Sequence, residues 1–129
     1  MKDNFDKYIF KHIKDNPEKK FTIFFPPYSI LAYKYFQKEE VFNNLMSLKG
    51  YIFIKLLKLN NVKIFDFQIA NKITFDLNNY KDVTHYSEDI NNWMVKQMKE
   101  KNYLVSKGNY KVYINKLQND VDSFTNNLE

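Results

Sequence analysis

An aspartate and a histidine stand three residues apart, as Asp82 and His85, between an expected strand and an expected helix. A neutral imidazole accepts protons near neutral pH, and a carboxylate on its other nitrogen fixes the tautomer and stabilises the imidazolium. In a turn, this spacing brings both side chains to one crevice. The pair predicts a general base, His85, oriented by Asp82. The alternative is a capped turn, in which Asp82 accepts backbone N–H groups while His85 packs.

Ser29 is the best-placed candidate nucleophile in the chain. It follows an apolar run that ends at Pro26-Pro27 and precedes an expected helix. It therefore lies at the carboxyl end of a strand, the edge where parallel sheets bind ligands. No glycine flanks Ser29, although a strained nucleophile elbow uses glycine on both sides. This absence favours the alternative that the Ser29 hydroxyl caps the helix or a turn.

Hydrophobic periodicity predicts where the helices and strands lie. Apolar residues at helical spacing indicate helices, and short aromatic or β-branched runs indicate buried strands. Asn16-Pro17 ends the first helix, because the residue before a proline is pushed out of the helical region. The expected elements are a helix over 5–13, a strand over 21–25, helices from 30 and over 41–57, a strand over 62–67, a helix over 88–101, a short extended segment over 103–105 and a helix from 109. Residues 68–87 have no clear period, which is typical of a functional or mobile loop.

The order strand, long helix, strand predicts a parallel, right-handed βαβ unit. The expected fold class is α/β: a partial flavodoxin-like, three-layer fold with a short parallel sheet of two main strands and four to five helices. The chain has no linker and no internal repeat, so residues 1–129 are expected to form a single domain.

Composition excludes several classes of site. The chain has 129 residues and no cysteine, which excludes disulfides, thiolate metal sites and a cysteine nucleophile. Two histidines are too few for a multi-histidine zinc site, so we expect no metal and no cofactor.

No apolar run reaches the roughly 20 residues that span a bilayer. Residues 1–20 lack a signal-peptide core. Location therefore stays open: cytoplasmic as written, or exported if a longer parent protein carries a signal upstream.

The net charge of +5 comes from twenty lysines, with no arginine. Lysine is a point charge and lacks the fork with which arginine reads guanine and phosphate. The lysines are spread along the chain, and the richness in Lys, Asn, Ile, Phe and Tyr is typical of an AT-rich genome. We therefore expect a solvated lysine surface and no specific nucleic-acid partner.

The segment Asn78–Ser87, with Ile90-Asn91 and Met94 after it, resembles the C-terminal block of SGNH (GDSL-type) hydrolases. In that superfamily an Asp-x-x-His pair precedes the last helix and completes a Ser-His-Asp triad. The FFPPYS stretch at 24–29 is similar to a subset linked to acyl modification of bacterial cell-surface polysaccharides. The resemblance covers roughly residues 4–125.

The resemblance implies a role for each candidate site residue. His85 would be the base and Asp82 would orient it. Asn78, Asn79 and Tyr86 would shape the loop or pocket. The candidate residues of the FFPPYS stretch are Tyr28 and Ser29.

The chain departs from the family at the nucleophile. Its two glycines, Gly50 and Gly108, do not precede Asp-Ser, and no glycine or asparagine matches the oxyanion donors of the family. The expectation is the C-terminal part of a larger SGNH-like fold, inactive alone, which acts on acylated carbohydrate when an N-terminal half completes it. A sheet of two strands leaves an open edge, so we also expect self-association or pairing with that half.

Two alternatives from other classes stay open. One is a non-catalytic interaction module held together by its aromatic helices. The other is a lysine-rich binder of acidic polymer or of a membrane surface, whose affinity would fall steeply with salt.

Overall fold

The centre of the fold is a two-stranded parallel sheet. The computed structural model describes residues 1–124. Strand β1 (Phe21–Phe25) pairs in parallel with β2 (Val62–Asp66), with Phe21 opposite Val62 and Phe25 opposite Asp66. The two proline residues after β1 lack the N–H that a further ladder bond requires, so pairing stops there. The predicted α/β class with a short parallel sheet is confirmed.

Helices fill most of the rest of the described chain. The first helical segment is continuous from residue 2 to 14 and contains a π-helical turn, Phe5–Phe10, between α1 and α2. Residues 68–79, expected to lack a clear period, hold a short helix between two 3₁₀ turns, Phe67–Ile69 and Leu77–Asn79, and the first of these turns begins at Phe67, which was expected to end the strand. The α-helices are α1 (Lys2–Asn4), α2 (Lys11–Lys14), α3 (Ile30–Lys38), α4 (Phe42–Leu56), α5 (Asn71–Thr74), α6 (Glu88–Lys99) and α7 (Tyr110–Ser123).

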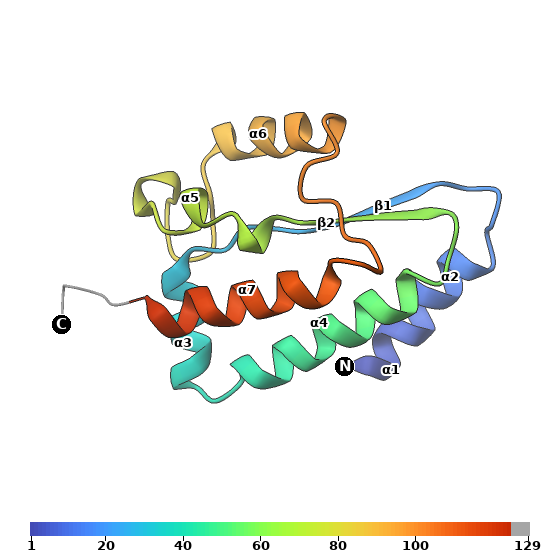
Figure 1. Ribbon diagram of the computed structural model, residues 1–129, viewed down its shortest axis with the longest axis horizontal. Coiled ribbons are helices and arrows are strands. Elements are labelled where there is room, and N and C mark those ends of the chain that lie inside the picture. Colours follow the sequence, from blue (N-terminus) through green and yellow to red (C-terminus); the bar gives the residue numbers. More distant parts are fainter. Residues whose placement is uncertain (125–129) are drawn as a thin grey trace.

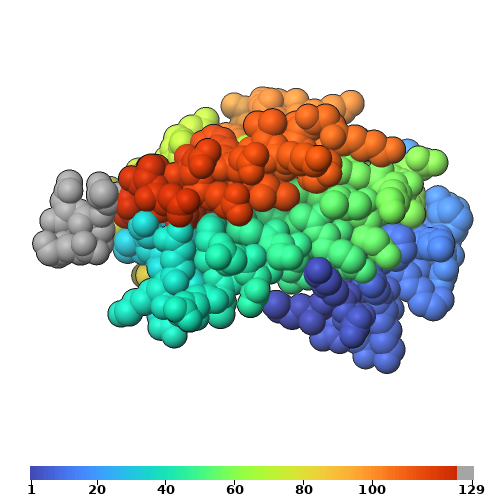
Figure 2. All heavy atoms as spheres, turned by 60° about the horizontal axis from the view of Figure 1, so that its bottom comes forward, coloured from blue at the N-terminus to red at the C-terminus, as the bar shows by residue number. Residues whose placement is uncertain are grey.

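The elements form three layers (Figure 1). Helix α6 covers one face of the sheet, and α4, α7 and the N-terminal helical segment lie on the other. Alternation along β2 explains this arrangement: Ile64 packs with Phe53 of α4, whereas Phe65 packs with Met94 of α6. On the face opposite α6, helices α4 and α7 run side by side, and the N-terminal segment lies against α4 (Figure 2).

The two strands differ in how well they are covered. β2 is buried on both faces near its carboxyl end. The prediction that residues 21–25 form a buried strand is wrong for one face of β1: Ile23 packs into the core, but Thr22 is exposed and the Phe24 side chain is 44% exposed. The reason is that α6 packs over Phe65 and Phe67, at β2 and just beyond it, and leaves the same face of β1 bare.

The segment after α6 closes the far edge of β2. Leu104 bridges Phe65 in antiparallel fashion, Val105 N donates to Ile64 O at 2.8 Å, and Asp66 N donates to Tyr103 O at 3.0 Å. The predicted extended piece at 103–105 is present only in part, because Leu104 and Val105 pair with β2 whereas Tyr103 lies in a turn with φ 65°. Among the described residues the open edge of the sheet is therefore the outer edge of β1.

Candidate active site

The Asp82–His85 pair lies at the tip of a narrow loop. Tyr80 bridges Tyr86, and Lys81 N donates to His85 O at 2.7 Å. The Tyr80 hydroxyl donates to Pro27 O at 2.7 Å, which ties this loop to the chain that leaves β1. The loop therefore holds a set position at the carboxyl end of the sheet.

Asp82 organises the tip of the loop. Its Oδ1 accepts from the backbone N–H groups of Thr84 at 3.0 Å and His85 at 2.9 Å. These two bonds, and then the His85 ring, lower the pKa of Asp82 to about 2. The capped turn of the alternative interpretation is thus present. The packed histidine of that interpretation is not, because the His85 side chain is 75% exposed.

The same carboxylate also holds the His85 ring. The Nδ1 atom lies 2.7 Å from Asp82 Oδ2 and 2.8 Å from Oδ1. An ionised carboxylate only accepts hydrogen bonds, so Nδ1 carries the proton and the neutral ring keeps its lone pair on Nε2. This is the orientation that a general base requires.

A solvent-open hollow of about 420 Å³ adjoins the ring. Its lining residues come from the end of β1 and from the loop: Pro26, Tyr28, Thr84, His85 and Tyr86. Tyr86 is half-buried, and burial followed by the nearby Tyr28 raises its pKa. The structure thus brings Tyr28, Tyr86 and His85 together around one space.

Ser29 is not among the residues that line the hollow beside His85. It is fully buried at the N-terminus of α3, where its Oγ accepts from Ala32 N at 3.4 Å. Its hydroxyl donates to Val83 O at 2.6 Å. Ser29 lines a separate pocket of about 180 Å³ with Asp82 and Tyr80. This is the capping geometry of the alternative interpretation, and no hydrogen bond joins Ser29 to His85 in residues 1–124.

The two asparagines shape the base of the loop. Asn79 donates from Nδ2 to Ile73 O at 3.0 Å, and its carbonyl accepts from Ser87 N at 2.8 Å. Asn78 has an exposed side chain, and its backbone N–H donates to Asp76 Oδ1 at 3.1 Å. Neither side chain is among the residues that line the hollow beside His85.

A second polar cluster was missed at the sequence level. Lys49 of α4 is buried, and its Nζ lies 2.8 Å from Asp66 Oδ2 and 2.8 Å from Gln68 Oε1. A signal was present, since Lys49 stands midway between Leu45 and Phe53 on the apolar stripe of α4. A lysine at such a position needs an acidic partner.

Within residues 1–124 no three histidine or acidic side chains gather as a metal site. No helix in the same range is long and apolar enough to cross a membrane. The chain matches no protein-family model, no curated protein and no solved structure. A functional assignment therefore depends on the geometry around His85 and on the resemblance of its loop.

Proposed function

We propose that this chain supplies the histidine and aspartate of an SGNH-like serine esterase or acyltransferase acting on acylated carbohydrate. The serine would come from a segment outside these residues. The observation that carries the proposal is the His85 ring, which Asp82 holds at Nδ1 and which lines an open hollow. The buried, capping hydroxyl of Ser29 is the reason to look for the nucleophile elsewhere.

In this reaction His85 Nε2 takes the proton of the serine hydroxyl as the serine oxygen attacks the ester carbonyl. The C–O bond to the sugar then breaks, and the imidazolium returns its proton to the sugar oxygen. Water, or a second sugar hydroxyl, releases the acyl group from the serine in the same way. Asp82 stabilises the imidazolium in both halves of the cycle and keeps its own charge throughout.

The open edge of β1 supports a missing partner. A parallel strand added there would pair with the edge, and a helix beyond it would cover the exposed ring of Phe24. The partner would be the N-terminal half of the fold or, in its absence, a second copy of the chain. A sharp monomer in sedimentation, with no binding of a hydrophobic dye, would contradict this part of the proposal.

The first test asks where the serine lies. The chain is treated with a fluorophosphonate probe and its intact mass is measured, with His85→Ala as the control. We expect no adduct on the folded chain, because the Ser29 hydroxyl is buried and already bonded. A single adduct on Ser29 that disappears in the control would place the nucleophile within the chain and contradict the proposal of an external serine.

The second test asks what the hollow recognises. A ¹⁵N-labelled sample is titrated with 6-O-acetylglucose and, in parallel, with glucose. We expect the acetylated sugar alone to shift the resonances of Tyr28, His85 and Tyr86, and His85→Ala to weaken the effect. If neither sugar moves these resonances up to its solubility limit, acylated carbohydrate is the wrong substrate class.

A non-catalytic interaction module is the second candidate, and the bare face of β1 favours it. Under this alternative His85 has no chemical role. His85→Ala would then leave self-association and partner binding unchanged, and it would not alter an esterase activity reconstituted with an N-terminal half. Loss of such an activity in a folded His85→Ala variant would favour the enzyme.

A further inference from the structure

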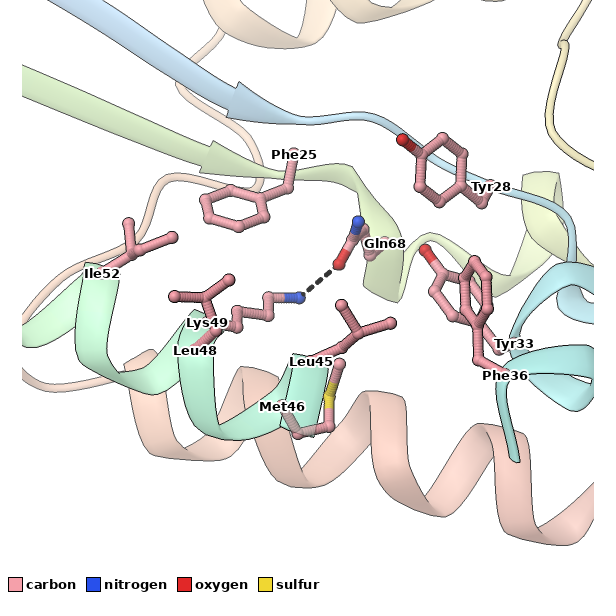
Figure 3. A pocket seen from close by; sticks show the side chains of 10 residues that line it. All are labelled: Phe25, Tyr28, Tyr33, Phe36, Leu45, Met46, Leu48, Lys49, Ile52 and Gln68. Atoms are coloured by element: carbon pink, nitrogen blue, oxygen red, sulfur yellow. Dashed lines mark hydrogen bonds between the residues drawn. The ribbon is translucent and has the colours of Figure 1, made fainter. Parts of the chain in front are cut away.

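An apolar pocket of about 130 Å³ opens between α3, α4 and the carboxyl end of the sheet (Figure 3). Four of its lining residues are aromatic and four are aliphatic, and the remaining two are the buried Lys49 and Gln68. The aromatic lining consists of Phe25, Tyr28, Tyr33 and Phe36, and the aliphatic lining of Leu45, Met46, Leu48 and Ile52.

The size of the pocket limits its occupant. A cavity of about 150 Å³ lined by leucine, isoleucine and phenylalanine stays dry and binds benzene. The present pocket is slightly smaller and richer in aromatic side chains, which favour offset or edge-to-face contacts with another ring. One six-membered ring therefore matches the volume of the pocket.

The polar groups at this pocket limit the charge of the occupant. The Lys49 ammonium is already matched by Asp66 at 2.8 Å, so the cluster is neutral overall. A carboxylate brought into the pocket would add an unmatched negative charge beside Asp66 and away from water. A neutral molecule avoids this cost.

Two hydrogen-bond donors remain for the occupant. Gln68 accepts from Lys49 through Oε1, which turns its amide nitrogen the other way, toward Phe25 and Tyr28 (Figure 3). The Tyr33 hydroxyl is buried without a hydrogen-bond partner among the described residues. Burial, followed by the charge of Asp66, raises the pKa of Tyr33 and keeps that hydroxyl protonated. A buried unpaired donor is costly, and an oxygen on the ligand would satisfy it.

We infer that this pocket binds a small neutral aromatic molecule with one oxygen acceptor, of the phenol class. The ring lies among the aromatic and aliphatic side chains, and the oxygen accepts from the Tyr33 hydroxyl. This inference does not rest on the esterase proposal, because the pocket excludes His85 and shares only Tyr28 with the hollow beside that ring.

The test uses phenol, benzene and benzoate as probes of the ¹⁵N-labelled chain. We expect saturable shifts at the pocket residues with phenol, weaker binding of benzene and no binding of benzoate. Tyr33→Phe should weaken phenol binding about two- to tenfold, the value of one net hydrogen bond, and leave benzene binding unchanged. Binding of benzoate as tight as that of phenol overturns the inference, and so does the lack of saturable shifts with phenol.

Filling the pocket gives a second, independent variant. Leu48→Phe adds a ring to a lining residue and should abolish binding of both phenol and benzene. Ile52→Phe replaces it if the first variant does not fold. The matched control is Val95→Phe on the exposed surface of α6, which should bind phenol like the parent chain. Unchanged phenol binding in a folded filled variant overturns the inference.

Discussion

The Lys49 ammonium lies 2.8 Å from the Asp66 carboxylate, and the two side chains are 3% and 0% exposed. Asp66 ends β2 and also accepts from Gln68 N at 3.0 Å, so the pair joins the middle of α4 to the carboxyl end of the sheet. Burial lowers the pKa of Lys49, and the charge of Asp66 acts against this shift. The charge of Asp66 thus helps to keep the buried Lys49 protonated.

Removing one member of this pair is expected to cost far more than removing both. Lys49→Met leaves Asp66 as an unpaired buried charge and should lower the free energy of unfolding by about 3–5 kcal/mol. Adding Asp66→Asn removes that charge and keeps an acceptor for Gln68, so the double variant should recover a large part of the loss. Urea denaturation measures the free energy of unfolding of the parent chain and of each variant. A loss in Lys49→Met no larger than in the exposed control Lys58→Met would contradict the role of the pair.

The second prediction concerns the tautomer of His85. Because Nδ1 faces the Asp82 carboxylate at 2.7 Å, the neutral ring should carry its proton on Nδ1. Long-range ¹⁵N–¹H spectra at high pH distinguish the two tautomers. We expect the Nδ1–H form in the parent chain and its loss in Asp82→Asn, whose amide can donate to the ring. A dominant Nε2–H form in the parent would remove the basis for a general base.

Local contacts were predictable from the sequence. The aromatic run 21–25 and the Asn16-Pro17 stop mark a strand and a helix end because their physical causes act within a few residues. The contact between Asp82 and His85 belongs to the same class, since three residues in a turn bring them together. The alternatives for Ser29 depended on the absence of glycine, which is also a local property.

Contacts between distant segments were not predictable in this way. Lys49 and Asp66 lie 17 positions apart and meet only when α4 packs across the end of β2. The bare face of β1 depends on which strand α6 covers, and no periodicity encodes that choice. The apolar pocket likewise needs α3, α4 and the sheet at once. Such features follow from the packing of whole elements.

The third prediction concerns the end of α3, where a left-handed residue is not a glycine. Glu40 has φ 60°, and Val41 N donates to Phe36 O at 3.0 Å, which closes a Schellman motif. A β-carbon in this conformation costs about 1–2 kcal/mol, which a glycine would relieve. Part of this gain in stability is lost again, because glycine has more conformational freedom in the unfolded chain. Glu40→Gly should therefore raise the free energy of unfolding by about 0.5–1 kcal/mol. The control is Glu39→Gly, at φ −82°, which should lower it. Equal effects of the two variants in urea denaturation would contradict this explanation.

The last prediction concerns alkaline pH. Burial raises the pKa of five tyrosines above the usual 10.0: Tyr33, Tyr80, Tyr86, Tyr103 and Tyr113. When the pH rises above 10, the unfolded chain loses these protons while the folded chain keeps them, so stability is full below that pH and falls above it. Lys49 acts in the opposite sense. Its pKa is lowered in the folded chain, so the folded chain releases the Lys49 proton at a pH at which the unfolded chain still holds it, up to about pH 10.5. A hydrogen bond with Asp6 raises the pKa of Tyr51 as well, so six tyrosines against one lysine give a net fall.

Urea midpoints measured at intervals from neutral pH to above pH 11 test this expectation. We expect the midpoint to decrease above about pH 10, since the slope follows the protons released by the unfolded chain. Tyr33→Phe removes the most deeply buried of the five phenols and should make the decrease less steep. Tyr8→Phe, at an exposed tyrosine, is the matched control and should leave the slope unchanged. A midpoint that rises between pH 9 and 11 would mean that Lys49, rather than the tyrosines, governs alkaline stability.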